Sequence, residues 1–330
     1  MNFDDFKRIY QSKIVSEYNN IVPEKPILSI CVQTYQHQDF ISQCLEGILM
    51  QETNFAIEIL LGEDNSSDGT RDICIKYAEK YPDKIRLFLH HRENNISVLD
   101  RPTGRFNFLY NLFSARGKYI AICEGDDYWT DPLKLQKQVD FLDANPDYVM
   151  CGHDAFVFDE NGIISNSKLL DNHKRDYSAT NLKRGVSILF MTICFRNIIK
   201  DIPPHFMKII NADSFLYAYL GQFGNYKYIP EIKSAAYRVH KGGIWSLVDS
   251  ETQLITRVSS LLWMGNYFKS INQTNLSNYY TTEIIDKLIW TLKDARVKDF
   301  LTIFFHLSKV LIYKLSPGIY YKIESLFKKK

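Results

Sequence analysis

Short apolar runs alternate with segments of helical periodicity between residues 27 and 123. Runs rich in β-branched and large apolar residues are typical of strands, whereas apolar residues that recur every three or four positions indicate helices. The expected strands are 27–34, 56–63, 84–90 and 118–123, and the expected helices are 39–51, 70–81 and 106–115. Because strands that alternate with helices form βαβ units, the pattern predicts an α/β fold with a mainly parallel central sheet flanked by helices.

The alternation continues less regularly beyond residue 130. Asp131 and Pro132 fit the N-cap and the first position of a helix in the segment TDPLKLQKQVDFLDAN. The apolar runs around Asn161-Gly162 predict two strands joined by a turn. The other expected elements are a strand over 187–196, a helix over 212–224, a strand over 233–240 and an almost wholly helical segment from residue 246 onward.

The length of 330 residues and the 45% hydrophobic content allow one large domain with an extension. We expect a helical lead-in over residues 1–25, an α/β domain over 26–245 and a helical extension over 246–330. The start, MNFDDFKRIYQSK, lacks the basic and apolar regions of a signal peptide, which predicts a cytoplasmic protein. Six widely spaced cysteines without a CxxC pair predict a reducing compartment with neither zinc nor disulfides.

The formal net charge of +2 is unevenly distributed. Residues 293–330 hold nine Lys or Arg and three acids, so the rest of the chain is slightly acidic and nucleic-acid binding through a broad basic face is not expected. The segment FLTIFFHLSKVLIY (300–313) is apolar on most of its helical surface, but Lys309, Lys314 and Pro317 interrupt it. This pattern favours a helix lying in the membrane interface over a spanning one. We therefore expect a peripheral protein at the inner face of the cell membrane, the alternative being that these helices pack on the main domain or in a homodimer.

Three carboxylates follow the strand expected over 118–123, namely Glu124, Asp126 and Asp127. Neighbouring carboxylates repel one another unless a cation or hydrogen bonds compensate. Mg²⁺ and Mn²⁺ prefer oxygen ligands and often bind one or two carboxylates together with substrate phosphates. Ligands of open α/β sheets bind beyond the carboxyl ends of the strands, where these acids are expected. A metal site is therefore indicated, with a solvated turn as the alternative.

Three segments together resemble the family 2 glycosyltransferases of the GT-A fold, which is Rossmann-like: LSICVQTYQHQDFISQCLEGILMQ, EILLGEDNSSDGT and GKYIAICEGDDYWTDPLKLQKQVDFL. The resemblance spans about residues 26–245 in the order of the family. It implies a nucleotide-sugar half over about 26–130 and an acceptor half over about 131–245. It also implies inversion at the anomeric carbon, a Mn²⁺ or Mg²⁺ cofactor, and a nucleotide-diphosphate sugar donor, for which we expect UDP. The expected acceptor is a glycan or a lipid-linked glycan in cell-surface polysaccharide synthesis.

The same resemblance implies which residues bind the donor. Gln33, Thr34 and Tyr35 match the end of the first strand, which contacts the base and ribose, with Gln33 in place of the usual proline. Glu63 and Asp64 match the acidic pair that faces the uracil or ribose. The remaining donor-binding candidates are Arg105 near the diphosphate, Asp126 of the acidic motif, and Trp245 over the sugar or acceptor.

Metal and catalytic residues are implied in the same way. Asp126 and Asp127 match the DxD metal-binding element, with His240 of YRVHKGGIWS as a further ligand and Glu124 as an additional candidate. Asp213 resembles the catalytic aspartate that removes the proton of the acceptor hydroxyl. A first-turn aspartate that interacts with the helix dipole is the alternative for Asp213.

Two other functions remain open from the residues alone. The first is a non-catalytic member of the same fold that binds a nucleotide sugar or glycan as an assembly partner. The second is a nucleotidyltransferase, which would need a phosphate loop rich in glycine and basic residues after the first strand, where VQTYQHQDF supplies none. The QxxRW element of processive synthases is also missing from the sequence, so transfer of a single sugar is expected.

Overall fold

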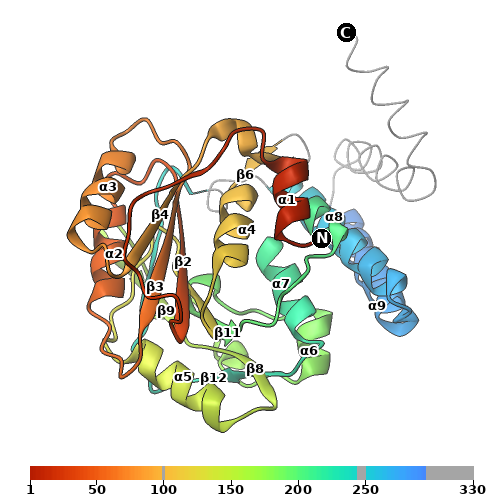
Figure 1. Cartoon of the computed structure of the whole chain (residues 1–330). Helices are drawn as coiled ribbons and strands as arrows, with labels where there is room; N and C mark the ends of the chain where they lie inside the picture. The colour runs from red at the N-terminus through yellow and green to blue at the C-terminus, as the bar shows by residue number, and fades with distance from the viewer. Residues whose placement is uncertain (99–100, 244–249, 295–330) are drawn as a thin grey trace. The chain divides into compact units, whose positions relative to one another are not determined.

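The computed structural model describes residues 1–98, 101–243 and 250–294 (Figure 1). These residues fall into two compact units. The first comprises residues 1–207 and 212–243, and the second comprises residues 208–211 and 250–294. Two of the sequence expectations, Trp245 and the helix over 300–313, lie outside the described residues.

The first unit is built on an eight-stranded sheet with the order β1–β4–β3–β2–β7–β11–β8–β12. Its strands are β1 (Ser16–Glu17), β2 (Leu28–Thr34), β3 (Ile57–Glu63), β4 (Ile85–Leu89), β7 (Tyr119–Ile122), β8 (Tyr148–Gly152), β11 (Cys194–Arg196) and β12 (Asn225–Tyr228). Strands β4, β3, β2 and β7 are parallel neighbours, and β12 pairs in parallel with β8. Only β1 and β11 run antiparallel to their neighbours in this sheet. The expected mainly parallel α/β architecture is confirmed.

Two smaller sheets complete the strands of this unit. Strands β9 (Ala155–Asp159), β10 (Gly162–Ser165) and β13 (Ala235–Arg238) form one in the order β10–β9–β13, and β5 (Ile96–Val98) pairs with β6 (Arg101–Thr103). The β9–β10 hairpin turns at Glu160-Asn161, and Asp159 pairs with Gly162, whose φ is +124°. Strand β13 pairs in parallel with β9 and thereby carries the segment that follows it toward the acidic motif after β7.

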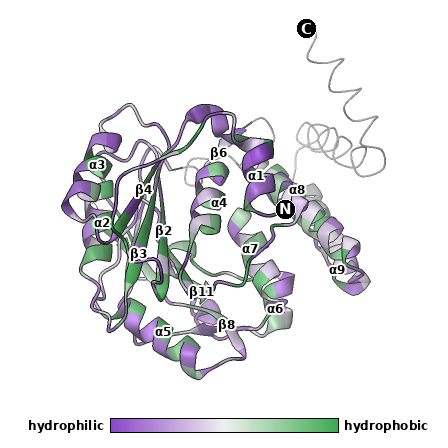
Figure 2. Ribbon diagram, in the orientation of Figure 1, coloured by the Kyte–Doolittle hydropathy of each residue, from purple (hydrophilic) through white to green (hydrophobic). Residues whose placement is uncertain are grey.

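Helices cover both faces of the central sheet (Figure 1). They are α1 (Phe3–Tyr10), α2 (Ile41–Leu49), α3 (Thr70–Lys80), α4 (Arg105–Ser114), α5 (Lys134–Ala144), α6 (Ala179–Arg184) and α7 (Ala212–Leu220). Apolar side chains of α2, α3 and α5 share one buried core with the sheet, while α4 lies on the opposite face. Figure 2 shows the strands β2, β3 and β4 as the hydrophobic centre between helices of mixed hydropathy.

The contact of α4 with the sheet is unusually polar. Asn107 Nδ2 donates to the carbonyl of Gly62 at 2.8 Å, and Asn111 Nδ2 donates to that of Val32 at 3.0 Å. A Cβ atom at Gly62 would lie 1.8 Å from Asn107 Oδ1, so only glycine allows this close approach. These contacts fix the last residues of β2 and β3, where the polar loops begin.

A buried ion pair lies at the other, amino ends of the strands. The Arg86 Nη1 group donates to Glu58 Oε2 at 3.1 Å, and Arg86 Nε donates to Glu17 Oε1 at 2.9 Å. The second oxygen of Glu58 accepts from Ser29 Oγ at 2.6 Å and from the backbone N of Arg116 at 2.7 Å. This network connects β1, β4, β3 and β2 with the turn before β7.

The structure departs from the sequence expectations in the second half of the first unit. The strand expected over 187–196 is a 3₁₀ turn, Phe190–Thr192, followed by the short antiparallel strand β11. The helix expected from Pro132 begins at Lys134, because Asp131 Oδ1 accepts from the backbone N of Leu133 in a preceding turn. Helix α6 and strand β12 were not expected from the sequence. The other 3₁₀ turns are Arg92–Asn94, Asp171–His173 and Pro204–Lys208.

The second unit contains the helices α8 (Ser250–Ser270) and α9 (Thr274–Asp294). They pack against each other around Phe268 and Tyr280, whose rings stack with centroids 5.7 Å apart. Asn272, with φ of +62°, lies in the short turn between them. No helix within the described ranges is long and apolar enough to cross a bilayer. The expected helical character of the C-terminal region is confirmed for residues 250–294.

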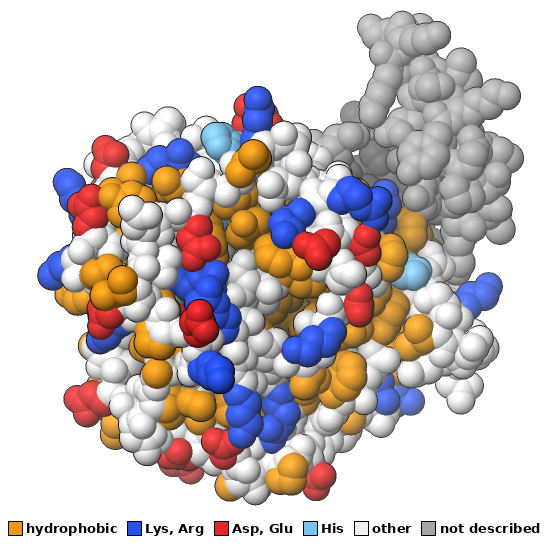
Figure 3. All heavy atoms as spheres, in the orientation of Figure 1, with side chains coloured by type: hydrophobic (Ala, Val, Ile, Leu, Met, Phe, Trp, Pro, Cys, Tyr) orange, Lys and Arg blue, Asp and Glu red, His pale blue; other side chains and the backbone are white. Residues whose placement is uncertain are grey.

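Charges of both signs are interspersed with hydrophobic side chains over the face shown in Figure 3. Lys and Arg side chains gather around a shallow hollow near the middle of this face, with hydrophobic side chains exposed at its floor.

Candidate functional site

Polar loops follow β2, β3 and β7 at one edge of the central sheet. The backbone N of Asp64 donates to the Thr34 carbonyl at 3.1 Å, and the N of Gly125 donates to the Gln33 carbonyl at 3.0 Å. These hydrogen bonds hold the loop after β2 between the loops after β3 and β7. The convergence of strand ends expected from the sequence therefore forms one site.

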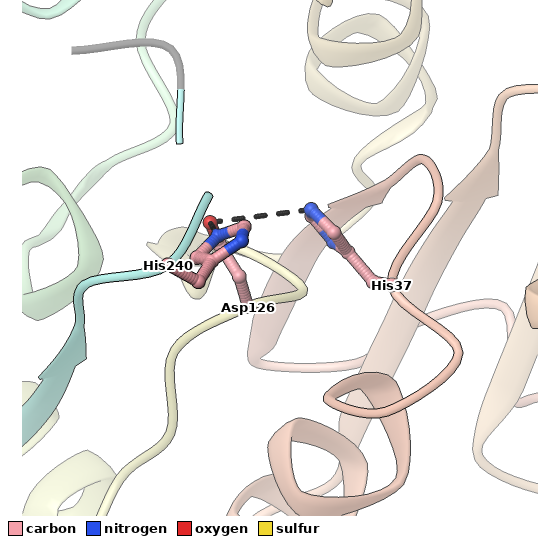
Figure 4. A group of neighbouring side chains, drawn as sticks. All are labelled: His37, Asp126 and His240. Carbon is pink, nitrogen blue, oxygen red and sulfur yellow. Dashed lines mark hydrogen bonds and ion pairs between the residues drawn. The ribbon is translucent and has the colours of Figure 1, made fainter. Parts of the chain in front are cut away.

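The centre of the site is a group of two histidines and one aspartate (Figure 4). His37 follows β2, Asp126 follows β7, and His240 follows β13. The distance from Asp126 Oδ2 to His240 Nε2 is 3.0 Å, and the distance to His37 Nε2 is 4.0 Å. Burial raises the pKa of Asp126, but the hydrogen bond from His240 and the nearby His37 outweigh it and hold that pKa below its ordinary value.

The donor set suits a divalent metal, because each residue offers one ligand atom and these atoms lie within 4.8 Å of one another. Carboxylate oxygens suit Mg²⁺ and Mn²⁺, and imidazole nitrogens suit iron and the later transition metals. The structure thus brings together two of the residues that the resemblance implied, Asp126 and His240. It adds His37, which the resemblance did not include.

Asp127 does not belong to this group. Its Oδ1 accepts a hydrogen bond from the backbone N of Arg238 at 2.8 Å, and its side chain is buried. Burial, followed by the charges of Asp126 and Glu124, raises the pKa of Asp127 well above its ordinary value. In this arrangement Asp127 fixes the backbone of β13, which is the strand that carries His240.

Glu124 has a third environment. Burial raises its pKa to about 8, with further contributions from the negative charges of Asp126 and Asp213. Glu124 therefore interacts electrostatically with both Asp126 and Asp213. At neutral pH a carboxyl with this pKa is largely protonated and can donate a hydrogen bond.

Arg238 is a functional candidate that sequence reasoning missed. Its Nε donates to the Asp126 carbonyl at 2.9 Å, and its Nη2 donates to Gln43 Oε1 at 2.5 Å. Its guanidinium lies 4.6 Å from the Phe40 ring centroid and 4.5 Å from that of Phe158. Arg238 thus connects the acidic motif with α2 and with the sheet of β9, and its position two residues before His240 was the only signal in the sequence.

On the β3 side, Glu63 is fully buried and its carboxylate already has partners. Oε1 accepts from the backbone N of Ser66 at 2.7 Å, and Oε2 accepts from the N of Asn65 at 3.2 Å and from Arg71 Nε. Asn65 has a φ of +59°, so this carboxylate stabilises a left-handed turn. In this structure Glu63 shapes the loop that presents Asp64.

Asp64 forms an ion pair with Arg92, which follows β4. The Arg92 guanidinium lies 3.9 Å from the centroid of the Tyr35 ring, and Tyr35 is one of the exposed large side chains. Burial raises the pKa of Asp64 to about 6, although the charge and hydrogen bond of Arg92 act in the opposite direction. Tyr35 and Asp64 are therefore brought together as expected. Arg92 was missed, because it lies in the polar segment after β4, which has no recognisable motif.

Gln33 and Thr34 complete this side of the site. Gln33 Nε2 is buried without a hydrogen-bond partner among the described residues, which is costly for an amide donor unless a ligand supplies an acceptor. Thr34 Oγ1 lies 3.2 Å from His37 Nδ1 and so connects the β2 end with the histidine group.

Asp213 lies in the first turn of α7, near Arg105 of α4. Burial raises the pKa of Asp213, and hydrogen bonds with Ser214, followed by the charge of Arg105, partly offset this effect. Arg105 is itself buried, and its Nη1 donates to the Phe206 carbonyl at 2.8 Å. Arg105 and the partly buried Asp213 are close enough to influence each other electrostatically, whereas Trp245, the remaining candidate, lies outside the described residues.

Comparisons with known proteins identify the family of the chain and its fold. The sequence profile of "Glycosyl transferase family 2" matches residues 29–202. An uncharacterized protein of Mycobacterium tuberculosis is 36% identical over 66% of this chain and 60% of its own length, so this chain spans less than two thirds of that relative.

Two solved structures share the fold. The mannosyltransferase PcManGT of Pyrobaculum calidifontis, in complex with GDP-Man and Mn²⁺, has a TM-score of 0.50 and 16% identity over 99% of this chain and 94% of its own. S. aureus TarS 1-349, in complex with UDP-GlcNAc, has a TM-score of 0.50 and 12% identity over 84% of this chain and 90% of its own. The expected GT-A fold is confirmed.

Proposed function

The chain belongs to glycosyltransferase family 2, and from this membership we propose that it is an inverting, metal-dependent transferase of single sugars. The proposed donor is a nucleotide-diphosphate sugar carrying UDP. The proposed acceptor is a glycan or lipid-linked glycan in cell-surface polysaccharide synthesis. The observation that carries the proposal is the spatial order of the site, with Asp64 for the base on one side, Asp126 for the metal at the centre and the partly buried Asp213 at the start of α7.

The ends of β2, β3 and β4 supply the groups that a nucleotide needs. The ring of Tyr35 and the guanidinium of Arg92 provide planar surfaces for a base, and the Asp64 carboxylate can accept from a ring N–H. The unpaired Nε2 of Gln33 supplies a donor for a carbonyl or hydroxyl oxygen. A uracil, with one ring N–H between two carbonyls, matches this combination of an acceptor with nearby donors.

Asp126 and His240 would hold the divalent metal beside the diphosphate. A metal bound there neutralises the charge that develops on the departing nucleotide diphosphate. Arg238 maintains the pair by binding the Asp126 carbonyl from the strand that leads to His240. The aromatic ring of Phe40 packs against His240, with centroids 4.7 Å apart, and limits the freedom of the imidazole.

Asp213 acts as the general base in this proposal. Its carboxylate takes the proton of the acceptor hydroxyl, while the hydroxyl oxygen forms a bond to the anomeric carbon. The bond from that carbon to the diphosphate oxygen breaks on the opposite face, and the configuration inverts. Burial raises the pKa of Asp213 toward the range in which a carboxylate is a more effective base. The positive charge of Arg105 favours the ionised form of this carboxylate.

The test is the variant Asp213→Asn, assayed with a panel of UDP- and GDP-sugars and Mn²⁺. We expect transfer to fall by about 10²- to 10⁴-fold, the usual contribution of a general base. Binding of the donor, measured by thermal shift, should remain, because the proposed nucleotide site lies at the ends of β2, β3 and β4, whereas Asp213 lies on α7. Undiminished transfer would remove Asp213 from the role of base. Donor binding by the wild type without transfer to any glycan acceptor would support a non-catalytic binding protein instead.

A further inference from the structure

His37 is close enough to Asp126 and His240 to share a ligand with them (Figure 4). We propose that His37, Asp126 and His240 form a three-residue metal centre of two imidazoles and one carboxylate, which prefers Mn²⁺ or a later transition metal to Mg²⁺ and binds it before the donor arrives. The role of this metal centre in sugar transfer rests on the proposed function, in which the metal lies beside the diphosphate. Metal binding by the three side chains does not depend on the sugar or the acceptor.

His37 is oriented toward the group by contacts on its other side. Its Nδ1 lies 3.2 Å from Thr34 Oγ1, and its backbone N donates to Thr70 Oγ1 at 2.8 Å. The ring therefore presents Nε2 to Asp126. A histidine ligand typically has its second nitrogen bound to another group in this way, which fixes the tautomer and the ring orientation.

The backbone before His37 is held in an uncommon conformation. Gln36 has a φ of +55°, a left-handed value that non-glycine residues rarely adopt and that occurs often at functional sites. The loop after β3 stabilises it, since Gln36 Oε1 accepts from the backbone N of Ser67 at 3.2 Å and from that of Asp68 at 3.1 Å. The strained backbone at Gln36 thus directs His37 toward the acidic motif.

The acidic motif is shaped to receive His37. A Cβ atom at Gly125 would lie 2.9 Å from His37 Nδ1 and 2.9 Å from the Gln33 carbonyl oxygen. Any side chain at position 125 would therefore push His37 away from Asp126. The absence of a side chain at Gly125 therefore leaves room for the His37 imidazole next to Asp126.

The spacing of the three ligand atoms fits a metal after a small adjustment. Neighbouring ligands with bonds of about 2.1 Å lie about 3.0 Å apart around an octahedral ion. Asp126 and His240 already have this separation, and the His37–Asp126 distance of 4.0 Å requires the His37 ring to move by about 1 Å. The Nδ1 of His240 accepts from the N of Gly242 at 3.2 Å, which leaves Nε2 on the side of Asp126.

The chemistry of this donor set predicts its selectivity. Mg²⁺ favours sites in which oxygen supplies nearly all the ligands, whereas imidazole ligands favour transition metals. Asp127 is not part of the group, and its Oδ1 already accepts from the backbone N of Arg238 at 2.8 Å. A site of two nitrogens and one oxygen is therefore expected to bind Mn²⁺ in the presence of excess Mg²⁺.

The test uses the metal-free full-length chain without nucleotide, with free Mn²⁺ measured by electron paramagnetic resonance during titration. We expect His37→Asn to weaken Mn²⁺ binding by roughly tenfold to a hundredfold, the loss typical when a metal site loses a supporting group. The matched control is His173→Asn, a histidine in the 3₁₀ turn Asp171–His173, and it should retain the wild-type affinity. Pulsed electron paramagnetic resonance of Mn²⁺ bound to the wild type should detect two coordinated imidazole nitrogens. This measurement does not depend on the folding of any variant.

Each outcome decides the proposal. One imidazole nitrogen, or equal Mn²⁺ affinity in wild type and His37→Asn, would overturn the three-residue centre. Displacement of Mn²⁺ by an equal concentration of Mg²⁺ would overturn its selectivity. If the wild type binds Mn²⁺ through two histidines but transfers no sugar from any donor, the metal centre stands and the proposed function fails. If it transfers sugar while His37→Asn retains full Mn²⁺ affinity, the function stands and this inference fails.

Discussion

At the residue scale, the three acids of the motif after β7 have three different tasks. Asp126 faces the histidines, Asp127 binds the backbone of Arg238, and Glu124 lies toward Asp213 with a pKa near 8. Their spacing in the sequence identifies the motif, but it does not predict which partner each side chain contacts. That choice depends on β13, whose Arg238 is 111 positions away from Asp127.

This difference predicts opposite results for two neighbouring substitutions. Asp126→Asn should weaken Mn²⁺ binding by at least tenfold, because it removes the charged ligand between the histidines. Asp127→Asn should change Mn²⁺ affinity by less than about threefold, because an amide oxygen can still accept from the Arg238 N. Mn²⁺ titrations of both variants check this, and equal losses would show that Asp127 is also a ligand.

The Asp64 carboxyl predicts a pH dependence of nucleotide binding. Its pKa is raised to about 6, so it is ionised at pH 7 and becomes protonated as the pH falls through that value. Protonation removes the acceptor for a ring N–H and weakens the ion pair with Arg92. The affinity for UDP should therefore fall about tenfold between pH 7 and about pH 5.

Calorimetric titration with UDP across this pH range measures the effect. Asp64→Asn is the control, since it retains the titration of the nucleotide phosphates but lacks the Asp64 carboxyl. An identical pH profile in the variant and the wild type would exclude Asp64 as the group responsible.

At the element scale, the first four parallel strands were predictable because each is a continuous apolar run with turn residues at its ends. Their positions also located the site, since ligands bind beyond the carboxyl ends of such strands. The strand β11 was overestimated because Ile188, Met191 and Ile193 are buried without belonging to a strand, and burial rather than strand pairing accounts for their hydrophobicity. Gly62 and its contact with Asn107 of α4 could not be foreseen, since they require the packed position of a helix 45 residues away.

The buried network at the amino ends of the strands predicts a large effect on stability. Glu58→Ala removes the partner of a buried guanidinium, and loss of one member of a buried ion pair costs about 3 kcal/mol or more. The control is Asp4→Ala, which breaks an exposed pair with Lys7 and should cost less than about 1 kcal/mol. Urea unfolding followed by circular dichroism compares the two. Similar losses in both variants would contradict a dominant role of the buried network.

At the scale of the whole molecule, the described residues form an α/β unit and a helical unit, and the sequence places the basic segment 293–330 at the end of the second. We expect this segment to bind anionic membrane surfaces, because its apolar runs are followed by the lysines of FKKK. Removal of residues 297–330 should move the protein from vesicles of anionic lipid to the supernatant in a sedimentation assay. Full retention on vesicles by the truncated chain would contradict this expectation, and high salt should weaken binding of the intact chain.

All six cysteines are buried, free thiols, and all of them lie in the α/β unit. A thiolate is the species that reacts, and burial raises the pKa of thiols such as Cys31 and Cys74, so the folded unit should resist aromatic disulfide reagents. Labelling would then proceed only as fast as this unit opens. The rate of cysteine labelling consequently measures the rate at which the α/β unit unfolds. It does not report on motion of α8 and α9, which contain no cysteine. The same inertness leaves a single cysteine introduced on the surface as the one fast-reacting position, suitable for a reporter of donor or metal binding.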